Sequence, residues 1–75
     1  MASFLSNVDD YLTCTGTTEY ALEKKCGLAK GCVYKWRNIY QTPSVKNLQR
    51  LERGTAIPMV AWLTEGGVRD ALAAH

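Results

Sequence analysis

Long hydrophobic runs are scarce in this sequence. The two longest are Ala56–Leu63 and the interrupted Val68–Ala74, and both fall far short of the roughly 20 apolar residues that a membrane-spanning helix needs. The first residues, Met1–Leu5, place no basic residue ahead of their apolar positions, which is unlike a secretory signal. We therefore expect no membrane span and a location in the cytoplasm.

Paired cysteines and histidines are scarce too. Cys14, Cys26 and Cys32 are odd in number and lack Cys-x-x-Cys spacing, so we expect them to be reduced. A zinc site made of these cysteines and His75 would need four scattered ligands, whereas zinc ligands usually come in closely spaced pairs. The sequence also lacks a glycine-rich phosphate loop and a pair of carboxylates at a predictable separation. We expect no enzyme, catalytic residue, metal, cofactor or small-molecule substrate.

The chain is short, with 75 residues, of which 47% are hydrophobic and 21% charged. That length suits a single domain spanning residues 1–75, and that balance is typical of a packed globular protein. Domains this small have little core to stabilise them and often gain stability from a second subunit, so we expect a homodimer. The apolar residues expected to be exposed for this contact are Met59, Trp62, Val68 and Leu72.

Positive charge is concentrated in the middle of the chain. Residues 24–53 hold eight basic residues and one acidic residue, a net charge of +7. The first 23 residues have a net charge of −4 and the last 22 a net charge of −1, which leaves +2 for the whole chain. A basic segment between acidic ones is typical of a surface that binds a polyanion, although a solvated helix surface gives the same pattern. The basic residues are Lys24, Lys25, Lys30, Lys35, Arg37, Lys46, Arg50 and Arg53.

Hydrophobic periodicity predicts two helices in the first third of the chain. In the first helix, with Ser3 as its N-cap, apolar residues recur at the spacing of one helical face. The β-branched, glycine-containing segment Thr13–Thr17 is predicted to be a loop. A second helix is expected near residues 18–26, between an N-cap at Thr18 and a stop at Gly27. The apolar face of the first helix comprises Phe4, Leu5, Val8, Tyr11 and Leu12.

Three further helices are predicted on the same grounds. The third lies near residues 29–38 and has a polar outer face, and either Thr42 or Ser44 caps the fourth, which ends at Gly54. The fifth has Pro58 at its first position, and a short last helix or a tail follows it. The residues expected to face inward are Val33, Trp36 and Ile39 in the third helix, Val45, Leu48 and Leu51 in the fourth, and Met59, Trp62 and Leu63 in the fifth. The predicted fold is all-α, a compact bundle of about five short helices.

Two of these helices, near residues 18–26 and 29–38, are joined at Gly27, and the second is polar and basic on one side. This is typical of a helix-turn-helix, in which the second helix enters the major groove of DNA. Residues 22–36 read Leu-Glu-Lys-Lys-Cys-Gly-Leu-Ala-Lys-Gly-Cys-Val-Tyr-Lys-Trp, with Pro43-Ser44 and then Leu48 to Leu51 downstream. In this register the chain resembles the lambda-repressor and Cro family of helix-turn-helix regulators over roughly residues 18–66.

Three residues depart from the family's pattern. Glu23 stands where a small residue usually packs between the two helices, so we expect the packing to open or the glutamate to lean outward. Ala29 replaces the serine or threonine that caps the second helix of the motif, at an expected cost of about 1 kcal/mol. Glu19 lies where such proteins often touch phosphate, which a carboxylate repels.

The resemblance implies a DNA-binding site made of two groups of residues. The groove-facing group comprises Lys30, Gly31, Tyr34, Lys35 and Asn38; lysine suits guanine and asparagine suits adenine. The phosphate-facing group comprises Tyr40, Gln41, Thr42, Ser44 and Lys46. The implied function is that of a sequence-specific double-stranded DNA-binding transcriptional regulator, a Cro-like repressor of phage, prophage or mobile-element type. As a dimer it would read an inverted-repeat operator.

Two other functions remain open for the same fold. The basic helix can dock on an acidic protein, as in an anti-repressor or an inhibitor of a host protein, or the chain can be a DNA-binding antitoxin that acts within a complex. Use of the third helix on DNA predicts sequence-dependent affinity that falls steeply with salt. A packed protein interface depends more weakly on salt, which separates the protein-binding alternative from the others.

Overall fold

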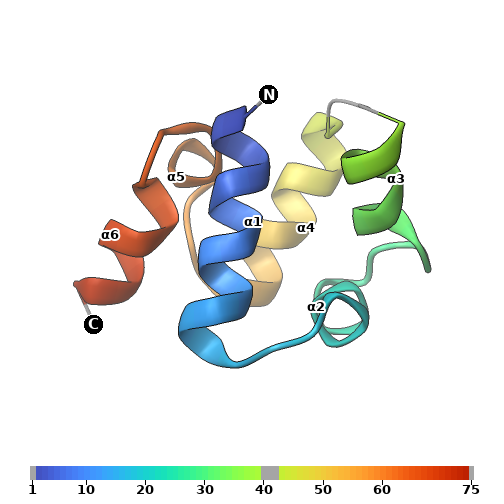
Figure 1. The fold of residues 1–75 in the computed structure, drawn as a ribbon, viewed down its shortest axis with the longest axis horizontal. Helices are drawn as coiled ribbons and strands as arrows, with labels where there is room; N and C mark the ends of the chain where they lie inside the picture. The colour runs from blue at the N-terminus through green and yellow to red at the C-terminus, as the bar shows by residue number, and fades with distance from the viewer. Residues whose placement is uncertain (1, 40–42, 75) are drawn as a thin grey trace.

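The protein is an all-α bundle in a computed structural model that describes residues 2–39 and 43–74 (Figure 1). Within these residues the regular structure is entirely helical, which confirms the predicted fold class. The segment predicted as a short last helix or a tail is a helix, so the count is six rather than about five. The helices are α1 (Ala2–Thr15), α2 (Glu19–Cys26), α3 (Cys32–Asn38), α4 (Val45–Thr55), α5 (Met59–Leu63) and α6 (Gly67–Ala73).

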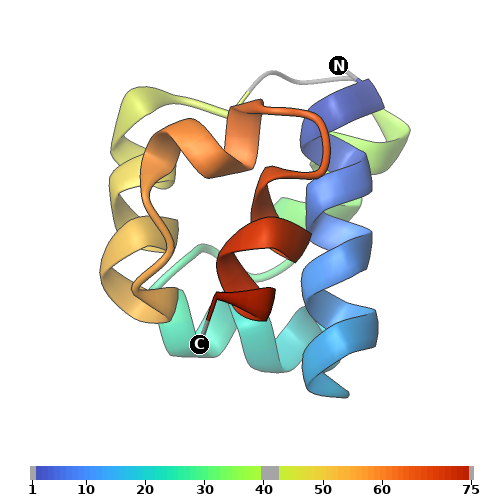
Figure 2. The same cartoon turned by 90° about the vertical axis from the view of Figure 1, so that its left-hand side faces the viewer.

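The helices pack in two groups. The longest helix, α1, packs against α5 and α6, while α2 packs against α4 and also contacts α3. Contacts between α4 and α5 join the two groups. In the view of Figure 2, α5 and α6 face the viewer and α3 lies on the far side of the molecule. The basic helix α3 is therefore at the opposite end of the bundle from α6.

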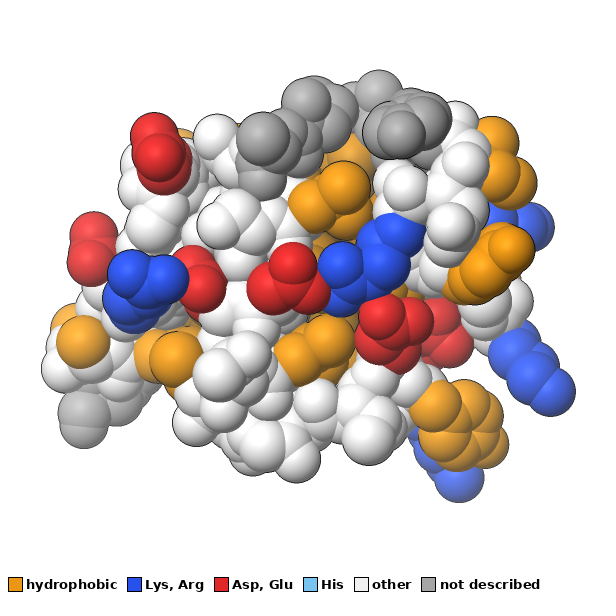
Figure 3. Space-filling view, in the orientation of Figure 1, with side chains coloured by type: hydrophobic (Ala, Val, Ile, Leu, Met, Phe, Trp, Pro, Cys, Tyr) orange, Lys and Arg blue, Asp and Glu red, His pale blue; other side chains and the backbone are white. Residues whose placement is uncertain are grey.

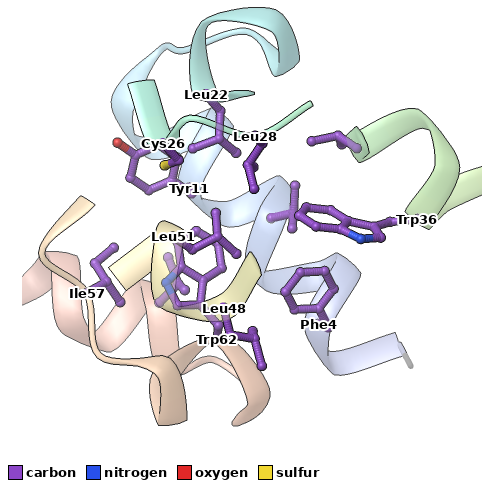
Figure 4. Close-up of a cluster of buried hydrophobic side chains, with 13 residues drawn as sticks. Phe4, Tyr11, Leu22, Cys26, Leu28, Trp36, Leu48, Leu51, Ile57 and Trp62 are labelled. Carbon is purple, nitrogen blue, oxygen red and sulfur yellow. The ribbon is translucent and has the colours of Figure 1, made fainter. Parts of the chain in front are cut away.

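The core is a single cluster that draws on every helix (Figure 4). Its centre is aromatic: the ring of Phe4 meets the ring of Trp36 edge to face at 5.0 Å between centroids, and Trp62 lies 5.8 Å from Tyr11. Such arrangements add about 0.5–1.5 kcal/mol per pair to the burial itself. The contact between Phe4 and Trp36 fastens the inner side of α3 to α1. The buried apolar residues are Phe4, Val8, Tyr11, Leu22, Cys26, Leu28, Val33, Trp36, Leu48, Leu51, Ile57, Trp62 and Val68.

One buried amide holds α1 to the turn between α5 and α6. The Asn7 side chain is fully buried, and its Nδ2 donates to the backbone carbonyls of Trp62 and Thr64 at 2.8 Å each and of Ala61 at 3.1 Å. Its Oδ1 accepts a hydrogen bond from the Val68 backbone N–H at 3.2 Å. The amide thus satisfies the Trp62 carbonyl at the end of α5 and the Val68 N–H at the start of α6, groups that helix ends leave without partners. The carbonyls of Ala61 and Thr64 also accept from backbone N–H groups.

Several predicted helix ends are wrong. Helix α1 begins at Ala2, so Ser3 lies within it and is not its N-cap, and Pro58 precedes α5 at the N-cap position and is not its first residue. The segment Thr13–Thr17 is not all loop: α1 continues to Thr15, whose hydroxyl donates to the Tyr11 carbonyl at 2.6 Å. The fourth helix does not stop at Gly54 but runs to Thr55, and Ala56 adopts the left-handed conformation at φ 63°. Gly54 has a different role, because a Cβ there would lie 2.9 Å from Cys26 Cα. The absence of a side chain lets α4 approach α2 closely.

Several residues expected to face inward are exposed, and two expected to be exposed are buried. Ile39, Val45 and Leu63 point to solvent, each with about half or more of its surface accessible. Trp62 and Val68 are fully buried, so neither is available for the predicted dimer contact, and Met59 and Leu72 are partly buried against the core. Ile39, Val45 and Leu63 all lie at or next to the end of a helix. The chain turns away from the core there, so an apolar residue in register with the buried face can still be exposed.

None of the helices that the structure describes has the length and apolar character to cross a membrane.

Candidate nucleic-acid interface

Helix α2 begins and ends where the sequence predicts. The Thr18 hydroxyl accepts a hydrogen bond from the Ala21 backbone N–H at 3.2 Å, which confirms it as the N-cap. Gly27 follows the last turn with φ 69°, a left-handed conformation that costs glycine little. The turn from Gly27 to Gly31 then leads into α3, so two short helices follow each other with five residues between them.

Helix α3 begins later than predicted. Residues 29–31 precede it, and the first helical residue is Cys32. Gly31 was expected within the helix, but it lies at the N-cap position with φ 80°. A left-handed residue interrupts a right-handed helix, and Gly31 brings no side chain to cap the one that follows. Lys30 and Gly31 therefore belong to the turn, and the outer face of α3 itself begins with Tyr34 and Lys35.

Glu23 does not lean outward, which was one of the two alternatives expected, and its carboxylate supplies the missing cap. The residue is only 6% exposed. Its Oε2 accepts from the Val33 backbone N–H at 2.9 Å and its Oε1 accepts from the Gly31 backbone N–H at 3.2 Å. The loss expected from Ala29 is therefore offset by a carboxylate on the preceding helix, which also interacts favourably with the positive end of the α3 dipole.

The inner side of α3 is fixed by one charged contact as well as by packing. Val33 and Trp36 are buried. The Arg37 guanidinium pairs with Asp9 of α1 and, from Nε at 2.8 Å, with Glu19 of α2. The pKa of Arg37 is raised, mainly by the hydrogen bond to Asp9. Desolvation acts in the opposite direction but does not cancel this rise. The expected repulsion between Glu19 and phosphate is weakened because this carboxylate pairs with Arg37, although Asp9 shares the same guanidinium.

The predicted groove-facing side chains lie together on the solvent side. Lys30, Tyr34, Lys35 and Asn38 are exposed, with Tyr34 at 61%. The Asn38 amide donates from Nδ2 to the Tyr34 carbonyl at 2.9 Å, which orients the side chain on the helix and leaves Oδ1 and the second N–H available.

The phosphate-facing group is described only in part. The Ser44 hydroxyl accepts from the Asn47 backbone N–H at 3.1 Å, so Ser44 caps α4 and its own O–H is still able to donate. Lys46 is exposed in the first turn of α4. Tyr40, Gln41 and Thr42 lie outside the described residues, so their predicted roles stay predictions.

Arg50 is a basic residue near α3 that the sequence did not single out. Asn47 connects the two helices: its Nδ2 lies 3.8 Å from Cys32 Sγ, and its Oδ1 accepts from Arg50 Nη1 at 3.3 Å. Burial raises the pKa of the Cys32 thiol, and the positive charges of Lys35 and Arg50 partly oppose this rise. Both cations are therefore near Cys32, the first residue of α3. The signal in the sequence was the spacing of Asn47 and Arg50, three residues and so about one turn apart on the predicted fourth helix.

Positive charge is unevenly distributed over the surface. In the part of the chain that the structure describes, the ion pairs of the basic residues involve only Arg37 and Arg69. The other seven basic residues of segment 24–53 are therefore free to meet an anion. Figure 3 shows Lys and Arg side chains extending furthest at the right-hand side, over α2 and α3, while acidic side chains lie on the left and across the middle of this face.

Neither a metal centre nor a small-molecule site is indicated in residues 2–39 and 43–74. These residues contain no group of three or more His, Cys, Asp or Glu side chains placed to hold a metal ion. No pocket opens among them either. The features that the surface does offer are the exposed, basic side of α3 and the cations of α4 beside it.

Comparison of the chain with protein-family models, curated proteins and solved structures gave no match.

Proposed function

We propose that this protein is a sequence-specific double-stranded DNA-binding regulator that reads the major groove with the exposed face of α3. One observation carries the proposal: the lysines around α3, Lys30, Lys35 and Lys46, are exposed and make no ion pair within the described residues. The one arginine of that helix, Arg37, is instead used to fasten it to the bundle. A helix whose outer face only contacts water does not require its arginine to be paired inside while the lysines around it stay exposed. DNA offers the matching partner, a groove about 12 Å wide lined by phosphates.

The roles of individual residues follow from their positions. Lys35 and Asn38 lie one turn apart or less on the exposed side of α3, where lysine can donate to guanine and asparagine can pair with adenine. Lys46 and Ser44, at the start of α4, are suited to phosphate, which positions a protein on DNA without reading its sequence. Lys30, in the turn before α3, supplies positive charge at the end of the helix that enters the groove. No catalytic step is part of this function.

A homodimer fits this function but not through the residues first expected. Paired recognition helices about 34 Å apart read an inverted repeat, so the preferred operator would be palindromic. Trp62 and Val68 are inside the core and make no such contact. The apolar side chains of α5 that do reach the surface are Val60 and Leu63, on a stretch from Gly54 to Thr64 that has no charged residue. Repression, as in a phage or mobile-element regulator, remains the expected mode.

The deciding experiment is a salt titration of binding to pools of random duplex DNA, with enrichment of the preferred sequence. We expect log K to fall linearly with log salt, by about 0.9 per phosphate neutralised, and a single sequence to be enriched. Binding that is undetectable at low salt would reject the proposal, since non-specific attraction is strongest there. That result would favour an acidic protein partner, whose packed interface depends less on salt.

A further inference from the structure

Glu23 joins α2 to α3 through two of its groups, the backbone carbonyl and the side-chain carboxylate. Its backbone carbonyl accepts from the Leu28 N–H at 2.8 Å, which closes the end of α2. Its side-chain carboxylate accepts from the N–H groups of Gly31 and Val33, at the start of α3. The end of one helix and the beginning of the next are therefore held by a single residue.

Within residues 2–39 and 43–74, no other side chain caps the start of α3. Gly31, at the N-cap, makes no side-chain hydrogen bond, and Ala29 has no polar group. The first N–H groups of a helix lack partners within it, and a buried N–H without a partner costs about 1–3 kcal/mol. With only seven residues, α3 also has little internal hydrogen bonding to hold its direction.

The charge of Glu23 is otherwise a disadvantage at this place. A carboxylate behind a DNA-reading helix repels phosphate, and a buried one is costly unless hydrogen bonds satisfy it. Among the described residues its side chain takes part in no ion pair, so the N–H groups of α3 are what stabilise it. A small apolar residue would pack between the helices without either cost.

We infer that Glu23 is a positioning residue for sequence recognition: it sets where α3 begins relative to α2, and so the place at which Tyr34, Lys35 and Asn38 meet the bases. It does this from the interior and without contacting DNA. This inference rests on the proposed DNA-binding function and adds a residue that determines specificity from behind the reading face.

The test compares Glu23→Gln with Glu52→Gln. Both substitutions remove one negative charge, but Glu52 is exposed on α4 and makes no ion pair within the described residues. Long-range electrostatics alone predicts equal or tighter DNA binding for both. A glutamine at position 23 can accept with only one oxygen, so one N–H of α3 faces an NH2 group. We expect Glu23→Gln to lose about tenfold in the ratio of specific to non-specific affinity, comparable to one base contact, and Glu52→Gln to keep the ratio.

Two further measurements separate positioning from a general loss of structure. The salt slope should be the same for Glu23→Gln and the wild-type protein, because no phosphate contact is removed. Glu23→Asp keeps the charge, but its side chain is one methylene shorter. It should also lose discrimination, because the carboxylate then lies further from the N–H groups of Gly31 and Val33. In the unmutated protein, hydrogen exchange of the Gly31 and Val33 amides should be as slow as that of amides within α2, which keeps the inference testable if the variants do not fold.

The outcomes are distinct. If the wild-type protein binds and Glu23→Gln discriminates as well as Glu52→Gln, the positioning role is wrong and the proposed function survives. Fast exchange of both amides in the wild-type protein would also overturn the role. If the wild-type protein binds no duplex DNA at low salt, the proposed function is wrong, and this role falls with it.

Discussion

The two halves of the molecule are held together by different means. Helices α1, α5 and α6 form a half that is fastened by a fully buried amide, Asn7, and by the rings of Phe4, Tyr11 and Trp62. Helices α2, α3 and α4 form the other half, in which charged side chains and caps fix the helices: the buried Glu23 and the partly exposed Arg37 hold α3, and Ser44 caps α4.

This difference separates stability from recognition. Interior hydrogen bonds without access to water are expensive to break, whereas exposed cations contribute little to folding and are free to bind an anion. We therefore expect substitutions in the α1–α5–α6 half to affect mainly the free energy of unfolding. Substitutions on the outer surface of the α2–α3–α4 half should affect mainly DNA binding.

The largest effect is expected at Asn7. Asn7→Ala leaves the Trp62 carbonyl and the Val68 N–H without a partner in the interior, and each unsatisfied buried group costs about 1–3 kcal/mol. The carbonyls of Ala61 and Thr64 keep hydrogen bonds from backbone N–H groups. We expect a loss of at least about 2 kcal/mol, measured by urea denaturation followed by circular dichroism. The matched control is Asn47→Ala, in the other half and only partly buried, which should cost about 1 kcal/mol or less. Equal losses for the two variants would contradict the comparison.

The next effect should appear in binding and not in stability. Lys35→Ala is expected to weaken the preferred DNA site by about 1–3 kcal/mol and to shift the free energy of unfolding by no more than about 0.5 kcal/mol. Lys46→Ala should weaken all sequences alike, because phosphate contacts carry no sequence information. Competition binding with preferred and random duplexes measures both. Unchanged sequence preference in Lys35→Ala would show that α3 is not the reader.

A smaller effect distinguishes two arginines of α4. Asn47 orients Arg50 beside the start of α3, whereas Arg53 lies one turn further along and is exposed. Arg50→Gln should lower the salt slope of DNA binding by about 0.9, the loss of one phosphate contact. Arg53→Gln removes the same charge and should leave the slope nearly unchanged. Equal slopes for both variants would mean that the orientation by Asn47 has no role in binding.

The smallest effect concerns the thiols. Burial raises the pKa of Cys26 and Cys32 above the ordinary 9.0, so both stay neutral at neutral pH. Their contribution to stability is complete below about pH 9, where the unfolded thiols are also protonated, and is lost as the pH rises further, because the unfolded chain ionises first.

Alkylation at pH 8 should modify the exposed Cys14 first, and Cys14→Ser should remove that fast phase. Fast labelling of Cys26 would show that the α2–α4 contact is open.

Much of the fold followed from local patterns in the sequence. Thr18, Gly27 and Ser44 marked helix ends correctly, because capping depends on one side chain and its nearest backbone groups. The stripes that contain Val33, Trp36, Leu48 and Leu51 identified buried residues, since periodicity reports which face a helix turns inward. The same reasoning failed for Ile39, Val45 and Leu63 at helix ends, where the chain leaves the core before the pattern stops.

By itself, then, the sequence determined the helical class, the caps at Thr18, Gly27 and Ser44, and the basic middle segment, all of which depend on neighbours in the chain or on composition. Only the tertiary structure decided what Asn7, Glu23, Arg37 and Gly54 do, because their partners lie on other helices. Hydrophobic periodicity does not explain a polar residue on a buried helical face. Its role becomes clear only when the carbonyls or N–H groups that it bonds are known. For α3, the element on which the proposed function depends, the starting point was set by such a contact from the preceding helix.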